Sequence, residues 1–252
     1  MTDRPLTPEP TRQHPSDKIV GDRRRTGPLY ARVAVFDLDN TVVHSRIDFT
    51  GIRHDLIGLL SGADALQEPA AEVSRRSIGG IIALAESWDG ERGTSLGLEA
   101  WNIVLRYEIS GMREATVEDG AGRVLAELRT AGLRLAVLTN NARPATLDAL
   151  ERFRLHACFD LVLTRDEVPM KPDPAGIHRA VGHFGSSAAE TVMIGDSWLD
   201  GAAAVDAGVP FIGFRARADV LRERGIHPWS VVQSLDELPA LLARQRWGRQ
   251  DG

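Results

Sequence analysis

The sequence predicts an α/β fold in which a parallel sheet lies between two layers of helices, with a helical insert after the first strand. From about residue 31, strand-like and helix-like segments alternate, and the strand-like segments are short apolar runs. Alternation of this kind indicates βαβ units, and unbroken apolar strands are typical of parallel sheets covered on both faces. A stretch from 44 to about 118 with several helical patterns and no clear strand predicts the insert.

Five segments are expected as strands because each is short, largely apolar and followed by polar or turn residues. In chain order they are Val33–Phe36, Arg134–Thr139, Phe159–Leu163, Thr191–Gly195 and Pro210–Phe214. Helical patterns between them are expected at Ala121–Ala131, Pro144–Phe153, Pro174–Phe184 and Trp198–Ala207. Together these segments predict a Rossmann-like three-layer α/β/α core with a parallel sheet.

The insert is expected to be all-helical, with helices at roughly 53–60, 69–88 and 95–110. Pro69 suits the first turn of a helix, and an apolar stripe that includes Trp101 favours packing over ligand contact. The expected domains are a disordered tail at 1–29, a core at 30–43 and 119–247, and the insert at 44–118. The tail is expected to be disordered because prolines interrupt it and no apolar period is sustained.

Composition narrows the classes of function and the location. The net charge of −5 gives no electrostatic case for binding nucleic acid or an anionic membrane. A single cysteine, Cys158, excludes an intrachain disulfide and fits a reducing, cytoplasmic location. No apolar run is long enough to span a bilayer, and no signal-peptide core follows Met1. Only Lys18 and Lys171 are lysines, so lysine chemistry in the folded body must use Lys171.

Two acids directly follow the first expected strand. Asp37 and Asp39 are spaced i and i+2, which on an extended segment places both side chains on the same side. They would converge at the carboxyl end of a buried strand, where open α/β sheets place their ligands. Bare carboxylates this close repel each other, so the pair needs a cation, a proton or both.

Polar residues also follow the other expected strands. Thr139 and Asn140 end the second strand, and Gly195-Asp196 ends the fourth, with Asp200 four residues after Asp196. Lys171 lies between the third and fourth strands. In a parallel sheet the residues at these strand ends face one crevice. Several polar clusters at one edge of the sheet are less expected by chance than a single cluster. Taken alone, Asp200 could simply favour the dipole of the following helix.

These segments resemble, in order, the four motifs of the haloacid dehalogenase superfamily, and specifically its phosphatase branch. The run Asp37-Leu38-Asp39-Asn40-Thr41 is similar to its first motif, DxDx[TV], and Thr139 to the second. Lys171 fits the third, and Gly195-Asp196 with Asp200 fits the fourth, GDxxxD. The insert falls where this family carries a helical C1-type cap. Phosphoglycolate-like and nucleoside monophosphate substrates are both implied by the resemblance.

The resemblance implies a role for each of these residues in phosphomonoester hydrolysis. Asp37 would attack phosphorus and form an aspartyl-phosphate, while Asp39 would first protonate the leaving group and then deprotonate water. A Mg²⁺ ion would be held by Asp37, Asp196 and the main-chain carbonyl of Asp39.

The same resemblance implies how the phosphoryl group is bound. Thr139 and the main-chain N–H groups near Leu38 and Asn140 would bind phosphoryl oxygens, and Lys171 would neutralise charge there. Asp200 would orient Lys171 or a metal-bound water. His44, Arg46 and Arg53 are candidates for contacting the leaving group, with a surface or interdomain role at least as well supported.

The residues present also bear on the other reactions that the superfamily catalyses. Asp39 disfavours dehalogenation, because a halide leaves without a proton, and the absence of lysine from the insert argues against an imine-forming phosphonatase. A sugar-phosphate mutase shares the motifs and stays open, as does, less favourably, a non-catalytic binding module. The expected function is a Mg²⁺-dependent phosphomonoesterase acting on a small phosphorylated metabolite.

Overall fold

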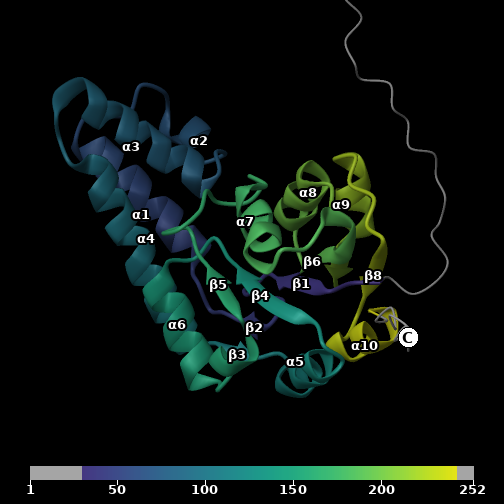
Figure 1. Cartoon of the computed structure of the whole chain (residues 1–252). Coiled ribbons are helices and arrows are strands. Elements are labelled where there is room, and N and C mark those ends of the chain that lie inside the picture. Colours follow the sequence, from purple (N-terminus) through teal and green to yellow (C-terminus); the bar gives the residue numbers. More distant parts are fainter. Residues whose placement is uncertain (1–29, 243–252) are drawn as a thin grey trace, which may run out of the picture.

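A computed structural model of the chain describes residues 30–242. Within them, a six-stranded sheet lies between two layers of helices, and a group of helices projects from one side (Figure 1). The strands of the sheet are β1 (Val33–Phe36), β4 (Arg134–Leu138), β5 (Leu161–Leu163), β6 (Thr191–Gly195), β7 (Phe211–Phe214) and β8 (Ser230–Val232). The expected tail at 1–29 and residues 243–247 of the expected core lie outside the described residues.

The sheet has the order β5-β4-β1-β6-β7-β8, and every neighbouring pair is parallel. The predicted α/β fold with a parallel sheet is therefore confirmed. Strand β1 lies inside the sheet between β4 and β6, so the carboxyl ends of these three strands are adjacent. The residues that follow them are brought together by the strand order alone.

Each face of the sheet buries one half of the alternating strand residues. In β1, Ala34 and Phe36 belong to one apolar cluster, whereas Val33 and Val35 belong to the other. The first cluster is covered by α5 (Ala121–Thr130), α6 (Arg143–Arg152) and α10 (Leu238–Leu241). The second is covered by α7 (Ala175–Phe184), α8 (Trp198–Ala207) and α9 (Ala218–Glu223). Burial on both faces explains why β1 is apolar at every position and its neighbours β4 and β6 are largely so.

The insert contains α1 (Phe49–Gly62), α2 (Ala70–Val73), α3 (Ile78–Arg92) and α4 (Leu96–Arg113). Helices α1, α3 and α4 pack against one another, and α4 also packs along α6 of the core (Figure 1). The single helix expected at 69–88 is wrong, because the chain leaves α2 after Val73 and begins again at Ser77. The Ser77 side chain accepts a hydrogen bond from the Gly80 N–H at 3.0 Å and so caps the start of α3.

Three short strands were not predicted. Strands β2 (Val43–His44) and β3 (Thr116–Val117) pair antiparallel at the base of the insert, although no strand was expected between 44 and 118. Strand β8 extends the sheet beside β7, in a region that gave no specific signal. Each is only two or three residues long, which is too short for a readable alternation. No helix within residues 30–242 is long and apolar enough to cross a bilayer.

Gly111 allows helix α4 to contact the segment that leads into the insert. A Cβ atom at Gly111 would lie 2.5 Å from the main-chain nitrogen of Ile47, and the Gly111 carbonyl accepts a hydrogen bond from the Arg46 N–H at 3.0 Å. We therefore expect Gly111→Ala to lower the free energy of unfolding by about 1–3 kcal/mol through overpacking. Thermal unfolding should detect this as a lower Tm, at about 2–4 °C per kcal/mol.

Gly58 provides the matched control for this prediction. It lies in α1, and a Cβ there would have no heavy atom within 4 Å. Gly58→Ala is expected to raise stability by about 0.5–1 kcal/mol, because alanine loses less backbone entropy in a helix. A Gly111→Ala protein as stable as Gly58→Ala would contradict the close approach of α4 to Ile47.

Candidate active site

The residues expected at the strand ends meet around one cavity at the carboxyl edge of the sheet. The cavity has a volume of about 660 Å³, within the range of small-molecule sites. Its core side is lined by Asp37, Asp39, Thr139, Asn140, Lys171 and Asp196, and residues of α1, α3 and α4 line the opposite side. The cavity therefore lies between the sheet edge and the insert.

Lys171 is held between two carboxylates beneath the cavity. Its Nζ donates to Oδ1 of Asp37 and, at 2.6 Å, to Oδ1 of Asp200, and the lysine is only 5% exposed. Burial opposes charge on this group, but Asp200 and Asp37 outweigh it and raise the pKa of the Lys171 ammonium above its ordinary value. The side chain is therefore a fixed cation.

Asn140 holds the main chain of Lys171 in place. Its Oδ1 accepts a hydrogen bond from the Lys171 N–H at 2.8 Å, and its Nδ2 donates to the Lys171 carbonyl at 2.9 Å. The end of β4 and the loop that carries the lysine are thus joined by a two-point contact. The expectation had assigned only the Asn140 main chain, so this function of its amide was missed.

Asp200 serves the end of β6 in two ways. Besides contacting Lys171, it accepts hydrogen bonds on Oδ2 from the Ser197 N–H at 3.0 Å and the Ser197 hydroxyl at 2.6 Å, which form a capping box at the start of α8. Gly195 leaves room for it, because a Cβ at that position would lie 2.4 Å from Asp200 Cγ. Asp200 thus makes the predicted contact with Lys171. It also lies in the first turn of α8, where the alternative interpretation placed an acid that favours the helix dipole.

Three carboxylates form a cluster that could hold a metal ion. Asp37, Asp196 and Asp200 each offer an oxygen, and these oxygens lie within 4.8 Å of one another. Burial raises the pKa of Asp37 well above its ordinary range, although Lys171 opposes the shift. Burial, with the nearby charge of Asp200, raises the pKa of Asp196 to about 7. Within residues 30–242, Asp196 has no basic side chain as an ion-pair partner, so a bound cation would stabilise its ionised form.

Asp39 is held by Ser45, at the start of the insert. Its Oδ1 accepts from the Ser45 N–H at 3.2 Å and its Oδ2 from the Ser45 hydroxyl at 2.9 Å. Burial raises the pKa of Asp39, and the hydrogen bonds from Ser45 oppose that shift. A carboxyl group with a raised pKa is suited to proton donation near neutral pH. Ser45 was not identified from the sequence, since nothing local marks it as a partner of Asp39.

Hydrogen-bond donors are available where the phosphoryl oxygens are expected. The Thr139 hydroxyl is buried and accepts a hydrogen bond from the Asn141 N–H at 3.2 Å, which leaves its own hydrogen free to donate. The N–H groups of Leu38 and Asn140 donate to no acceptor within residues 30–242. These donors follow the adjacent strands β1 and β4. Their binding of phosphate stays a prediction.

Of the candidates for contacting the leaving group, only Arg53 lines the cavity. Its Nη1 donates to the Arg76 carbonyl within the insert. His44 and Arg46 do not line the cavity, which fits the surface or interdomain role that the sequence left open for them. His44 contacts Glu118, which also binds Arg215 at 2.7 Å, so His44 belongs to a hydrogen-bonded group at the base of the insert. Arg46 is exposed to solvent and lies outside the cavity lining.

A buried ion pair between insert and core was missed. Glu108 of α4 contacts Arg165, which follows β5, and their side chains are only 5% and 8% exposed. The Arg165 guanidinium also lies 4.8 Å from the ring centroid of Trp101, which lines the cavity and packs against the core. Arg165 follows its strand as Thr139 follows β4, so the same inspection of strand ends could have found it.

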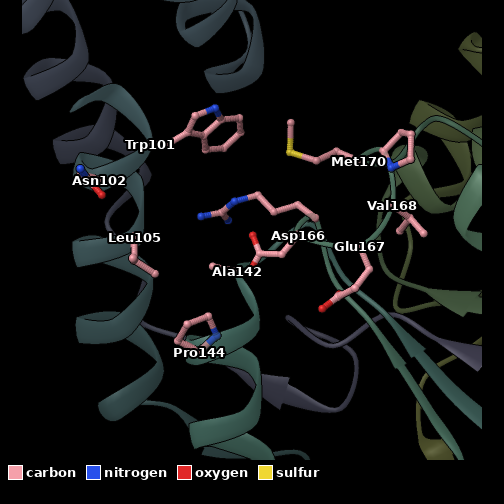
Figure 2. A pocket seen from close by; sticks show the side chains of 11 residues that line it. Trp101, Asn102, Leu105, Ala142, Pro144, Asp166, Glu167, Val168 and Met170 are labelled. Carbon is pink, nitrogen blue, oxygen red and sulfur yellow. The ribbon is translucent and has the colours of Figure 1, made fainter. Parts of the chain in front are cut away.

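A second cavity of about 580 Å³ adjoins the first and shares Trp101, Arg165 and Met170 with it. In Figure 2, Trp101, Asn102 and Leu105 of α4 lie across this cavity from the loop between β5 and α7. The loop contributes Asp166, Glu167, Val168 and Met170. The wall between the two cavities thus includes the Arg165 side chain.

Comparison with known proteins identifies the family. A model of the haloacid dehalogenase-like hydrolases matches residues 31–208. The chain is 30% identical over 220 residues to a phosphoglycolate phosphatase of Nitrosococcus oceani, covering 83% of this chain and 96% of that protein. It is 32% identical over 189 residues to one of Caulobacter vibrioides, covering 72% of this chain and 78% of that protein.

Solved structures have the same fold at lower identity. A predicted phosphoglycolate phosphatase from Haemophilus somnus superposes with a TM-score of 0.59 at 18% identity, covering 86% of this chain and 98% of that one. A haloacid dehalogenase-like hydrolase from Bacteroides fragilis gives a TM-score of 0.60 at 21% identity, covering 82% and 99%. With the family match over most of the sheet and the site, the chain belongs to the haloacid dehalogenase-like hydrolase family, in its phosphatase branch.

Proposed function

We propose that this phosphatase hydrolyses a small phosphate monoester with the help of Mg²⁺, through a phosphoryl group carried transiently by Asp37. One observation carries the proposal: the Lys171 ammonium contacts Asp37 directly at the base of a cavity of about 660 Å³. A fixed cation beside the attacking carboxylate offsets the repulsion between that carboxylate and an anionic phosphoryl group.

The residues present fit a magnesium ion. Carboxylate oxygens are the ligands that Mg²⁺ prefers, and the oxygens of Asp37 and Asp196 lie within 4.8 Å of each other. Lys171 compensates Asp37 and Asp200, whereas Asp196 has no basic partner within the described residues. Asp37, Asp196 and the main-chain carbonyl of Asp39 are therefore the proposed ligands. When bound, the ion supplies positive charge that stabilises the transferring phosphoryl group.

The chain's own side chains account for both steps of hydrolysis. In the first, an oxygen of Asp37 attacks phosphorus, the bond to the leaving oxygen breaks, and Asp39 gives its proton to that oxygen. In the second, Asp39 takes a proton from water, whose oxygen attacks phosphorus and frees inorganic phosphate and the Asp37 carboxylate. Lys171, the Thr139 hydroxyl and the N–H groups of Leu38 and Asn140 hold the phosphoryl oxygens.

The names of the relatives point to the substrate class. The phosphoglycolate phosphatases of Nitrosococcus oceani and Caulobacter vibrioides make phosphoglycolate the first substrate to test. Nucleoside monophosphates remain the alternative, as does transfer to a sugar phosphate in the manner of a mutase. The cytoplasmic location and the lack of nucleic-acid partners stay predictions from composition.

The proposal is tested by phosphate release from 4-nitrophenyl phosphate and from a panel of phosphorylated metabolites, with Mg²⁺ and with EDTA. We expect hydrolysis that requires Mg²⁺ and is lost with EDTA. Phosphate transfer to an added sugar phosphate that exceeds release of free phosphate would favour the mutase. Absence of both reactions with every substrate in Mg²⁺ would overturn the proposal and favour a binding module.

Asp196→Asn examines the metal site separately. Loss of this carboxylate is expected to raise the Mg²⁺ concentration needed for half-maximal activity by at least ~10-fold, because Mg²⁺ relies on few protein carboxylates. A titration of activity against Mg²⁺ measures the change. Asp206→Asn, on the exposed side of α8, is the control and should leave the titration unaltered. Equal curves for Asp196→Asn and the unchanged protein would exclude Asp196 as a ligand.

A further inference from the structure

We infer that Arg165 selects substrates by binding a carboxylate on the leaving group, and that Glu108 occupies this carboxylate position while no substrate is bound. The inference rests on the proposed phosphatase function and adds a specificity residue to the same cavity. Three observations support it. Arg165 lies beside the expected phosphate-binding residues, hydrogen-bond donors around it have no acceptor within residues 30–242, and Glu108 belongs to the insert.

Arg165 lies next to the residues that are expected to bind phosphate. Its Nη1 donates to the Asn140 carbonyl at 3.1 Å, while the Asn140 side chain holds the main chain of Lys171. Asn140 directly follows Thr139 in the chain, so the guanidinium contacts the residue next to Thr139. Arg165 also lines the catalytic cavity. A short leaving group on a phosphate bound by these donors would lie in the cavity that Arg165 also lines.

Donors around Arg165 are unused. The hydrogen bonds of the guanidinium run from Nη1 to Glu108 and Asn140, and its Nε and Nη2 donate to no acceptor within residues 30–242. The buried Nδ2 of Asn141 also has no acceptor there, and Asn141 lines the cavity. The Arg165 N–H donates to the Asn141 carbonyl at 3.4 Å, which keeps the two residues adjacent. A carboxylate of the substrate would supply acceptors for such donors, since an arginine fork binds carboxylates in a bidentate manner.

Glu108 already presents a carboxylate to Arg165, from the insert side of the cavity. It lies on α4 of the insert, and its other oxygen accepts a hydrogen bond from the Ala142 N–H at 3.1 Å. A buried arginine left without a counter-ion is costly, so Glu108 keeps the free protein stable. A substrate carboxylate can take its place without leaving the arginine unpaired.

The other basic side chains of the cavity differ from Arg165 in where they are held. Lys171 is held by Asp37 and Asp200, and Arg53 donates to the Arg76 carbonyl within the insert. Among the described basic residues that line the cavity, Arg165 combines a position beside the phosphate donors with unused donors of its own. Trp101 packs against the guanidinium plane and helps to fix its orientation.

Two esters of matched size test the inference: phosphoglycolate, whose leaving group ends in a carboxylate, and 2-hydroxyethyl phosphate, whose leaving group ends in a hydroxyl. The unchanged protein should have the higher kcat/KM for phosphoglycolate. Arg165→Gln should lower the ratio of the two kcat/KM values by about 10–100-fold, mainly through KM for phosphoglycolate, because a charge-assisted hydrogen bond is lost. Glu108→Gln should lower KM for phosphoglycolate, because the internal competitor is gone.

The double variant Glu108→Gln/Arg165→Gln removes both charges together and avoids an unpaired buried ion, so it covers a failure of Arg165→Gln to fold. It should show the same lowered ratio. Arg75→Gln, an exposed insert position paired with Glu72, is the control and should keep the ratio. An Arg165 that only ties the insert to the core would lower both kcat/KM values equally, and this result would overturn the inference. Absence of hydrolysis of both esters by an unchanged protein that still hydrolyses 4-nitrophenyl phosphate would overturn the inference alone, whereas absence of hydrolysis of all three would count against the proposed function.

Discussion

Asp37→Asn is expected to lower kcat for every phosphate monoester by roughly 10⁴-fold or more, which corresponds to about 5–6 kcal/mol of transition-state stabilisation. The amide of asparagine has nearly the same shape as the carboxylate but cannot attack phosphorus to form an acyl phosphate. Because Asp37 is 6% exposed and has a raised pKa, the neutral amide should be accommodated without loss of the fold. Steady-state rates at saturating substrate, with thermal unfolding of the same samples, measure both effects.

Asp64→Asn is the matched control for this result. Asp64 is exposed in the insert and has a positive φ of 53°, a conformation that asparagine adopts readily. The control should keep full activity. Acid quenching of the unchanged protein during turnover, followed by peptide mapping, should recover phosphate on the peptide that contains Asp37. A variant that retains a substantial fraction of kcat, or phosphate recovered on another peptide, would remove Asp37 as the nucleophile.

Lys171→Met should reduce both activity and stability. Loss of the ammonium is expected to lower kcat/KM by about 10²–10³-fold, since a fixed charge aimed at the transferring group is removed. The free energy of unfolding should fall by about 3–5 kcal/mol, because Asp37 and Asp200 are left as buried acids without their counter-ion. Urea unfolding and steady-state kinetics measure the two losses separately.

The double variant Lys171→Met/Asp200→Asn separates the structural effect of the lysine from its catalytic effect. Removing one of the two stranded carboxylates should restore part of the stability, while kcat/KM should stay low. Recovery of the rate together with the stability would mean that the lysine acts only by holding the fold. An unaltered urea midpoint for Lys171→Met would contradict the buried contacts of Lys171 with Asp37 and Asp200.

The sheet and the sequence-predicted cluster around Asp37 could be predicted because they depend on local signals. Each long strand is an apolar run that ends in polar residues, and parallel pairing alone brings those ends together. This is why the sequence alone assigns Asp37, Thr139, Lys171 and Asp196 to one edge of the sheet. Helix α8 was predicted with its observed bounds for the same reason.

The remaining features depend on contacts between distant segments. Glu108 and Arg165 are 57 residues apart, and their pairing requires α4 to lie against the loop after β5. His44 follows the Asp37–Thr41 motif closely, but pairing of β2 with β3 places it beside Glu118 rather than in the cavity. The break between α2 and α3 depends on the cap at Ser77, which competes with a continuous helical pattern.

The antiparallel pairing of β2 with β3 also bears on how this protein can change over evolution. Val43 pairs with Val117 and His44 with Thr116, so the chain leaves the core and returns to it at neighbouring points. The register of β1 with β4 and β6 is fixed outside this pair of strands. Segments of the insert beyond Ser45, which holds Asp39, can therefore be lengthened or shortened while the residues that follow β1, β4 and β6 keep their places. Changes of length in the insert would thus reshape one side of the cavity and leave the strand ends on the other side in register.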